Sequence, residues 1–238
     1  MFCFYVFVCL YLQNILGFTA EEAGYLLLAS TIVLGLLSPF SGHIMKYIAA
    51  RYLISFSCLL LAMSLLMLMI SISTTSMIYL LISLILFGTA FAVHFPTTNI
   101  VVLQMAPSKD SALVTGILFT LAFTGASAGI TLSSTLLSEL SEYKLTPFIS
   151  SSKTSLSKDQ LEWVQNAASG AGPLNKLSQL PSTISHQSIA IVKHSFVFGF
   201  QVVLMICLIL ALLGMITALI VLKNFNPSYD SILLEPIL

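Results

Sequence analysis

Charged residues are scarce in this sequence of 238 residues: Asp, Glu, Lys and Arg together make up 8%, where a soluble domain has about 25%. Hydrophobic residues make up 58%, and the mean hydropathy is +1.02. This composition excludes an ordinary soluble domain and predicts a polytopic membrane protein. The formal net charge is zero, so no global field indicates a nucleic-acid partner.

Residues that commonly build reactive centres are also few. The four cysteines, Cys3, Cys9, Cys58 and Cys207, lie inside apolar runs without metal or disulfide spacing, and we expect them to pack as small hydrophobic residues. The sequence has no phosphate-binding glycine loop and no nucleophile elbow. It therefore indicates neither an enzyme nor a bound metal or cofactor.

Long stretches of the chain contain no Asp, Glu, Lys or Arg at all. A membrane span needs about 20 apolar residues, and it must be helical because lipid offers unpaired backbone groups no partner. The sequence thus predicts an all-α integral membrane protein with six transmembrane helices, the last of which is nearly featureless and is expected to face lipid. We expect these helices at residues 1–17, 23–45, 52–71, 77–104, 111–138 and 195–222.

Basic residues in the short loops predict the orientation, because Lys and Arg are retained on the cytoplasmic side. Lys46 and Arg51 follow the second predicted helix, Lys109 follows the fourth and Lys223 follows the sixth. The charged residues of the loop after the first helix are both acidic. Both termini are therefore expected in the cytoplasm, with the protein in a plasma membrane or a bacterial inner membrane.

The predicted spans divide the chain into four parts. Residues 1–140 hold spans one to five, 141–194 an extracytoplasmic loop, 195–222 span six and 223–238 a cytoplasmic tail. Within the loop, SLSKDQLEWVQNAASG has the spacing of a helix cap and an apolar stripe. It predicts a short amphipathic helix with Trp163 at the membrane interface.

Three stretches resemble the C-terminal half of the major facilitator superfamily, and within it the fourteen-span drug:proton antiporter family. YLQNILGFTAEEAGYLLL resembles the junction of the first two spans of that half, and LLSPFSGHIMKYIAAR stands where the family repeats its cytoplasmic loop motif. GTAFAVHFPTTNIVVLQMAPSKDSALVTGILFTLAFTGASAG resembles its fourth and fifth spans. The resemblance implies one half of the fold, a 3+3 inverted repeat, with Met1 as an internal methionine.

The resemblance also implies a function. The whole protein would be a multidrug efflux antiporter that works by alternating access, driven by protons and acting on a small hydrophobic or cationic substrate. Its partners would be the lipid bilayer and the missing N-terminal half. Two alternatives stay open: a half-transporter that associates with a second copy of itself, and a truncated remnant that transports nothing.

Candidate substrate-binding residues lie in the fourth predicted span. Apart from tyrosine and cysteine, His94 is the one ionisable residue well inside a span, and such residues are functional candidates in a membrane. Phe87, Phe91 and His94 share one helical face, and Asn99 follows about a turn and a half later. This face could bind substrate or a proton. Alternatively, His94 could be a packing residue that hydrogen-bonds a neighbouring helix.

A second, mildly polar face is predicted in the first span, where Tyr5, Cys9 and Gln13 follow at intervals of four residues. Gln13 matches a glutamine of the resembled family. The first and fourth spans of each half line the cavity in that family, which implies that Tyr5 and Gln13 also belong to the substrate site.

The cytoplasmic loop motif is degenerate. Gly42 and Arg51 match the family pattern, but Lys46 stands where the family has an aspartate. The acid-based latch of the cytoplasmic gate is therefore absent. Alternatively, Lys46 and Arg51 are positive-inside anchors and nothing more.

Small residues dominate the fifth predicted span. Gly125 and Gly129 form a GxxxG motif, and Gly116 adds to a second row of small residues. Such residues let helix backbones approach closely. The resemblance implies that this helix packs at the moving interface between the two halves; the alternative is a plain packing seam.

Overall fold

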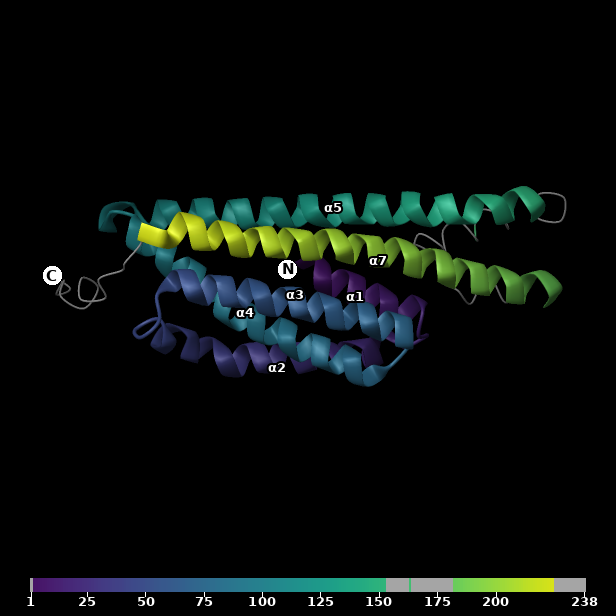
Figure 1. The fold of residues 1–238 in the computed structure, drawn as a ribbon, viewed down its shortest axis with the longest axis horizontal. Coiled ribbons are helices and arrows are strands. Elements are labelled where there is room, and N and C mark those ends of the chain that lie inside the picture. Colours follow the sequence, from purple (N-terminus) through teal and green to yellow (C-terminus); the bar gives the residue numbers. More distant parts are fainter. Residues whose placement is uncertain (1, 153–162, 164–181, 225–238) are drawn as a thin grey trace. The chain divides into compact units, whose positions relative to one another are not determined.

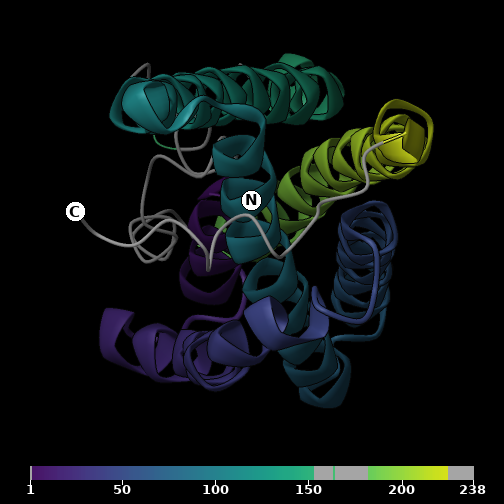
Figure 2. The same cartoon turned by 90° about the vertical axis from the view of Figure 1, so that its left-hand side faces the viewer.

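The computed structural model describes residues 2–152, 163 and 182–224 of the chain. Within them, Figures 1 and 2 show helices and no strand. The all-α prediction is therefore confirmed for this part of the chain. The α-helices are α1 (Phe2–Asn14), α2 (Ala20–Ile44), α3 (Ala50–Thr74), α4 (Met77–Met105), α5 (Ser111–Ser152) and α7 (Ser182–Val221).

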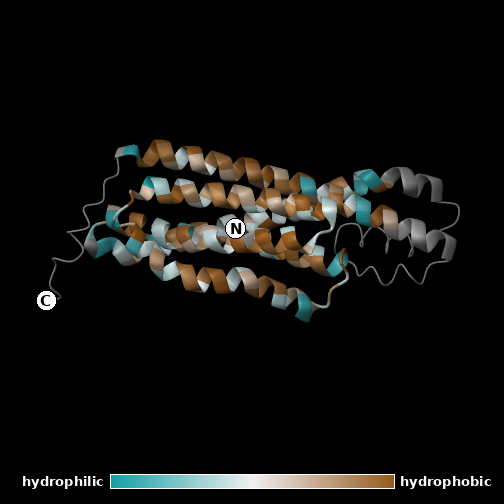
Figure 3. Ribbon diagram, turned by 60° about the horizontal axis from the view of Figure 1, so that its bottom comes forward, coloured by the Kyte–Doolittle hydropathy of each residue, from teal (hydrophilic) through white to brown (hydrophobic). Residues whose placement is uncertain are grey.

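Five of these helices are long and apolar enough to cross a membrane: α2, α3 and α4 throughout, and α5 and α7 over Ser111–Leu145 and Ala190–Val221. Helix α1 has 13 residues, and its apolar part runs from Phe4 to Asn14. Figure 3 shows hydrophobic residues along the helices and hydrophilic ones gathered near helix ends. This is the pattern expected of helices that span a bilayer.

The predicted boundaries of the long loop differ from the observed helices. Helix α5 continues to Ser152 instead of ending at 138, and α7 begins at Ser182 instead of 195. Charged residues such as Glu142 and Lys144 end an apolar run, but they favour a helix that continues beyond the membrane. The predicted amphipathic helix lies outside the described residues except for Trp163.

The start of α2 shows how the sequence sets a helix end. The Thr19 hydroxyl accepts a hydrogen bond from the Glu22 backbone N–H at 3.2 Å, and the Glu22 carboxylate accepts one from the Thr19 backbone N–H at 2.8 Å. This reciprocal capping box satisfies two backbone donors that the first helical turn would leave unpaired.

The chain forms two compact units, and each is described by itself. Unit one comprises Met1–Leu26 and Gly125–Ile206, and unit two comprises Leu27–Thr124 and Cys207–Leu238. Helices α2, α5 and α7 contribute to both units.

The core of unit one is aromatic and centres on Phe200 of α7. Its ring lies 6.0 Å from that of Tyr11, 5.9 Å from that of Phe7 and 5.9 Å from that of Phe196. Gly199 brings α7 against α5, because a Cβ atom there would lie 2.9 Å from Ser141 Oγ. The prediction that the sixth span faces lipid is therefore wrong for this part of α7, because Phe196 and Phe200 are fully buried in these ring contacts.

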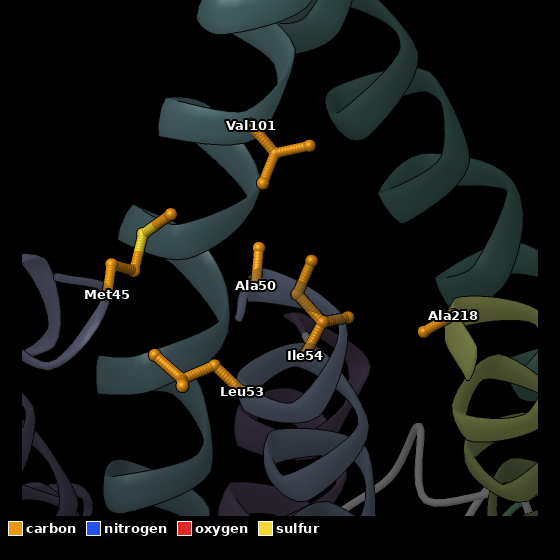
Figure 4. Packing of buried hydrophobic residues seen from close by; sticks show 6 residues of the cluster. All are labelled: Met45, Ala50, Leu53, Ile54, Val101 and Ala218. Carbon is orange, nitrogen blue, oxygen red and sulfur yellow. The ribbon is translucent and has the colours of Figure 1, made fainter. Parts of the chain in front are cut away.

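Unit two has a hydrophobic cluster where α2 ends and α3 begins. Figure 4 shows side chains of α3, α4 and α7 converging there. The buried members of the cluster are Met45, Ala50, Leu53, Ile54, Val101 and Ala218. This packing holds the ends of α3 and α4, the two helices that carry the candidate site.

Helices α2 and α4 meet at Gly88. A Cβ atom at this position would overlap the backbone carbonyl oxygen of Ser30 and lie 3.1 Å from its Cα. Both Gly88 and Ser30 are buried. A glycine is thus required for the two backbones to approach this closely.

Candidate functional site

Serine side chains join α3 to α4 in unit two. Ser64 and Ser83 are fully buried, and each hydroxyl donates to the backbone carbonyl of the other residue at 2.9 Å. Nearer the connection between the helices, the Ser71 hydroxyl donates to the Ser76 carbonyl at 3.0 Å. Ser57, Ser64 and Ser71 are seven residues apart, so they lie on one face of α3. This serine row fixes how α4 sits on α3.

His94 is held by the first member of the serine row. Its Nδ1 lies 3.0 Å from the Ser57 hydroxyl oxygen, and that oxygen lies 2.7 Å from the Ile54 carbonyl. At 2.7 Å the Ser57 hydroxyl can donate to the Ile54 carbonyl, which can only accept. The donor in the contact with His94 depends on the tautomer of the ring, and we assign the tautomer in which Nδ1–H donates to Ser57 and Nε2 is left as a hydrogen-bond acceptor.

A row of phenylalanine rings runs along α4 and continues on α5. The ring of Phe91 lies 6.3 Å from Phe87 and 5.6 Å from Phe95. Phe95 lies 6.1 Å from Phe119 of α5, which lies 6.4 Å from Phe123. Phe87 is fully buried, whereas Phe95 is 41% and Phe123 59% exposed. The row therefore has a buried end and an accessible end.

Polar side chains follow Pro96 in α4. Asn99 donates from Nδ2 to the Phe95 carbonyl at 2.8 Å, so its amide is tied to its own helix. The buried polar side-chain atoms of Thr97, Thr98 and Gln104 have no hydrogen-bond partner within the described residues. Of these, Thr97 is fully buried. This end of α4 thus offers hydroxyl and amide groups but no charge.

The candidates in α1 belong to unit one. Gln13 is exposed and donates from Nε2 to Cys9 Sγ at 2.9 Å. The ring of Tyr5 packs edge-on against Phe4 at 6.2 Å. The predicted spacing on one helical face is present, and the substrate role of both residues remains a prediction.

The Arg51 side chain contacts the end of another helix and a neighbouring ring, which a positive-inside anchor does not require. Its Nη1 donates to the Lys223 carbonyl after α7 at 3.1 Å, and its Nη2 donates to the Tyr52 hydroxyl at 2.8 Å. The guanidinium carbon also lies 4.5 Å from the centre of the Tyr52 ring. Arg51 therefore ties the start of α3 to the end of α7, while Lys46 is exposed in the connection after α2.

Two of the three glycines predicted to pack in the fifth span, Gly116 and Gly125, are exposed on α5. A Cβ atom at Gly116 or at Gly125 would meet no other described atom within 4 Å, while Gly129 is half-buried. Their role at an interface remains a prediction.

The family model described as Major Facilitator Superfamily matches residues 1–152, which is 152 of 238 residues. The chain belongs to the Major Facilitator Superfamily. Members of the superfamily are membrane transporters, and the described helices fit one half of their fold. No curated protein matches the chain.

Of the contacts of this superfamily chain, the serine row has a signal in the sequence and the others have none. The interval of seven between Ser57, Ser64 and Ser71 is readable without a structure. Gly88 and Gly199, which make the close helix contacts, stand alone and have no GxxxG spacing. Phe119 follows no local pattern with Phe95, because that contact joins two different helices.

Proposed function

We propose that this chain is the C-terminal half of a multidrug efflux transporter that moves small hydrophobic or cationic compounds by alternating access. The observation that carries the proposal is the phenylalanine row of Phe87, Phe91, Phe95, Phe119 and Phe123 beside His94. An aromatic wall with few polar groups is typical of sites for large apolar molecules. The resemblance to the fourteen-span antiporters supports efflux as the direction.

We further propose that transport is coupled to protons and that His94 is the protonatable group of this half. No Asp, Glu, Lys or Arg lies in residues 52–108. An imidazole changes its charge near neutral pH, which suits a relay. Its bond to the buried Ser57 gives the ring a fixed orientation, as a proton-transfer group requires.

The accessible face of α5 is the surface on which we propose that a partner packs. Gly116 and Gly125 have open space around them, which favours a packing partner that the described chain does not supply. We propose an N-terminal half in this place, with both termini of this chain in the cytoplasm. A second copy of the chain is the alternative that the same observation supports.

The test is the accumulation of a fluorescent dye in a host that lacks its own efflux pumps. The chain would be expressed alone, with a co-expressed N-terminal half of the same family, and as a His94→Phe variant. We expect lower dye accumulation with the co-expressed half, abolished by a proton uncoupler and reduced in the variant. Unchanged accumulation in cells that contain both halves in the membrane would contradict the proposed transport and favour the remnant.

A further inference from the structure

Three side chains of α4 near its midpoint point into one sector of the helix. Relative to Phe91, Phe95 is rotated by about 40° and His94 by about 60° in the opposite sense, so the three lie within an arc of about 100°. Phe119 and Phe123 of α5 continue the ring row from Phe95. One sector therefore combines several aromatic faces with an imidazole.

The imidazole contributes a hydrogen-bond acceptor to this sector. In the tautomer assigned above, in which Nδ1–H donates to Ser57, the other nitrogen Nε2 carries a lone pair. Within the described part of the chain, the hydrogen bond of His94 is the one at Nδ1. A ligand with an N–H or O–H group would therefore find an acceptor here.

Among hydrophobic and cationic compounds, the charges of the described residues favour a neutral ligand. The one acid among the described residues of unit two is Asp110, in the turn η1 (Ser108–Asp110) before α5. Phe119 lies nine residues further along α5, about 13 Å from it. The ring faces attract a cation, but the described residues of unit two offer it no carboxylate beside the row, so the loss of its hydration inside a membrane is only partly offset.

We propose that the phenylalanine row and His94 bind a neutral, planar aromatic molecule that carries one hydrogen-bond donor. The flat body would extend the row of rings by offset stacking, and its N–H or O–H would donate to His94 Nε2. This inference rests on the proposed function, because it names the substrate class of the same site.

The experiment measures binding to the full chain in lipid nanodiscs, with empty nanodiscs as the reference for partitioning into lipid. The probes are carbazole, N-methylcarbazole and ethidium. Carbazole is neutral and planar with one N–H, N-methylcarbazole lacks this donor, and ethidium is a planar cation. We expect carbazole to bind roughly fivefold more tightly than N-methylcarbazole through the added hydrogen bond, and ethidium not to displace it.

Variants test the named residues. The substitution Phe95→Ala or Phe119→Ala is expected to weaken carbazole binding by roughly three- to tenfold, because the ring stacking is lost. Phe56→Ala is the matched control, because Phe56 is 53% exposed on α3 outside the ring row. His94→Phe is expected to abolish the preference for carbazole over its N-methyl derivative.

The outcomes separate this site from the transport proposal. If carbazole binds empty nanodiscs equally well, or if Phe56→Ala weakens its binding as much as Phe95→Ala does, the proposed site is wrong and the phenylalanine row contacts lipid. Displacement of carbazole by ethidium would overturn the neutral substrate class. If carbazole binds more tightly than N-methylcarbazole but the two co-expressed halves do not lower dye accumulation in cells, the site is supported and efflux is contradicted.

Discussion

His94 has a packing contact with a neighbouring helix, and we propose a chemical role for the same ring. Its hydrogen bond to Ser57 confirms the predicted contact with a neighbouring helix, and in the tautomer assigned above Nε2 remains a hydrogen-bond acceptor. A serine would suffice for packing alone, as the pair of Ser64 and Ser83 demonstrates further along the same helices.

The strength of this bond can be measured by a double-mutant cycle. We expect Ser57→Ala, His94→Phe and the double variant to give a coupling free energy of about 0.6 kcal/mol, with about 1.7 kcal/mol as an upper bound, as for other hydrogen bonds between membrane helices. Unfolding in mixed micelles with increasing dodecyl sulfate measures it. Coupling of zero would mean that Ser57 and His94 do not interact.

Gly88 provides a prediction about stability. Because a Cβ atom there would overlap the Ser30 carbonyl oxygen, we expect Gly88→Ala to lower the free energy of unfolding by about 1–3 kcal/mol. The matched control is Gly35→Ala in α2, where a Cβ atom meets nothing within 4 Å. The control is expected to be neutral or slightly stabilising. Equal effects of the two substitutions would argue against the close contact of α2 and α4.

Among the helices, sequence reasoning succeeded where lipid imposes a simple rule. Runs free of charge must be helical in a membrane, and this predicted where α2, α3 and α4 lie. The rule says nothing about helices outside the bilayer, so it predicts the start of α5 but neither its C-terminal end nor the start of α7. It is also silent on which helices touch, so the contact of Phe95 with Phe119 could not be predicted.

Arg51 hydrogen-bonds from the start of α3 to the chain after α7, and a substitution can show whether these bonds or only its positive charge matter. Arg51→Lys keeps the positive charge, but an ammonium group cannot bond the Lys223 carbonyl and the Tyr52 hydroxyl in the same planar geometry. We therefore expect unchanged membrane orientation and a free energy of unfolding lower by about 1 kcal/mol. If Arg51→Lys were as stable as the parent chain, Arg51 would act through its charge alone.

The molecule as a whole is expected to have one orientation in the membrane. In a variant without its native cysteines, Tyr47→Cys lies in the connection with the basic residues, and Thr75→Cys lies in the uncharged connection between α3 and α4. We expect an impermeant maleimide to label Thr75→Cys in intact cells and Tyr47→Cys only after permeabilisation. The reverse pattern would place the basic loops outside and invert the proposed topology.

The central claim is that one face of α4 lines a ligand site and does not face lipid. Phe95 and Ile82 are similarly exposed, at 41% and 38%, but they lie about 140° apart around the helix axis. The decisive measurement is the rate at which a water-soluble maleimide labels Phe95→Cys and Ile82→Cys in native membranes, with and without carbazole. We predict that Phe95→Cys is labelled and is protected by carbazole, while Ile82→Cys is not labelled. Absence of labelling at Phe95→Cys, or equal labelling of both cysteines without protection, would contradict the site and the function built on it.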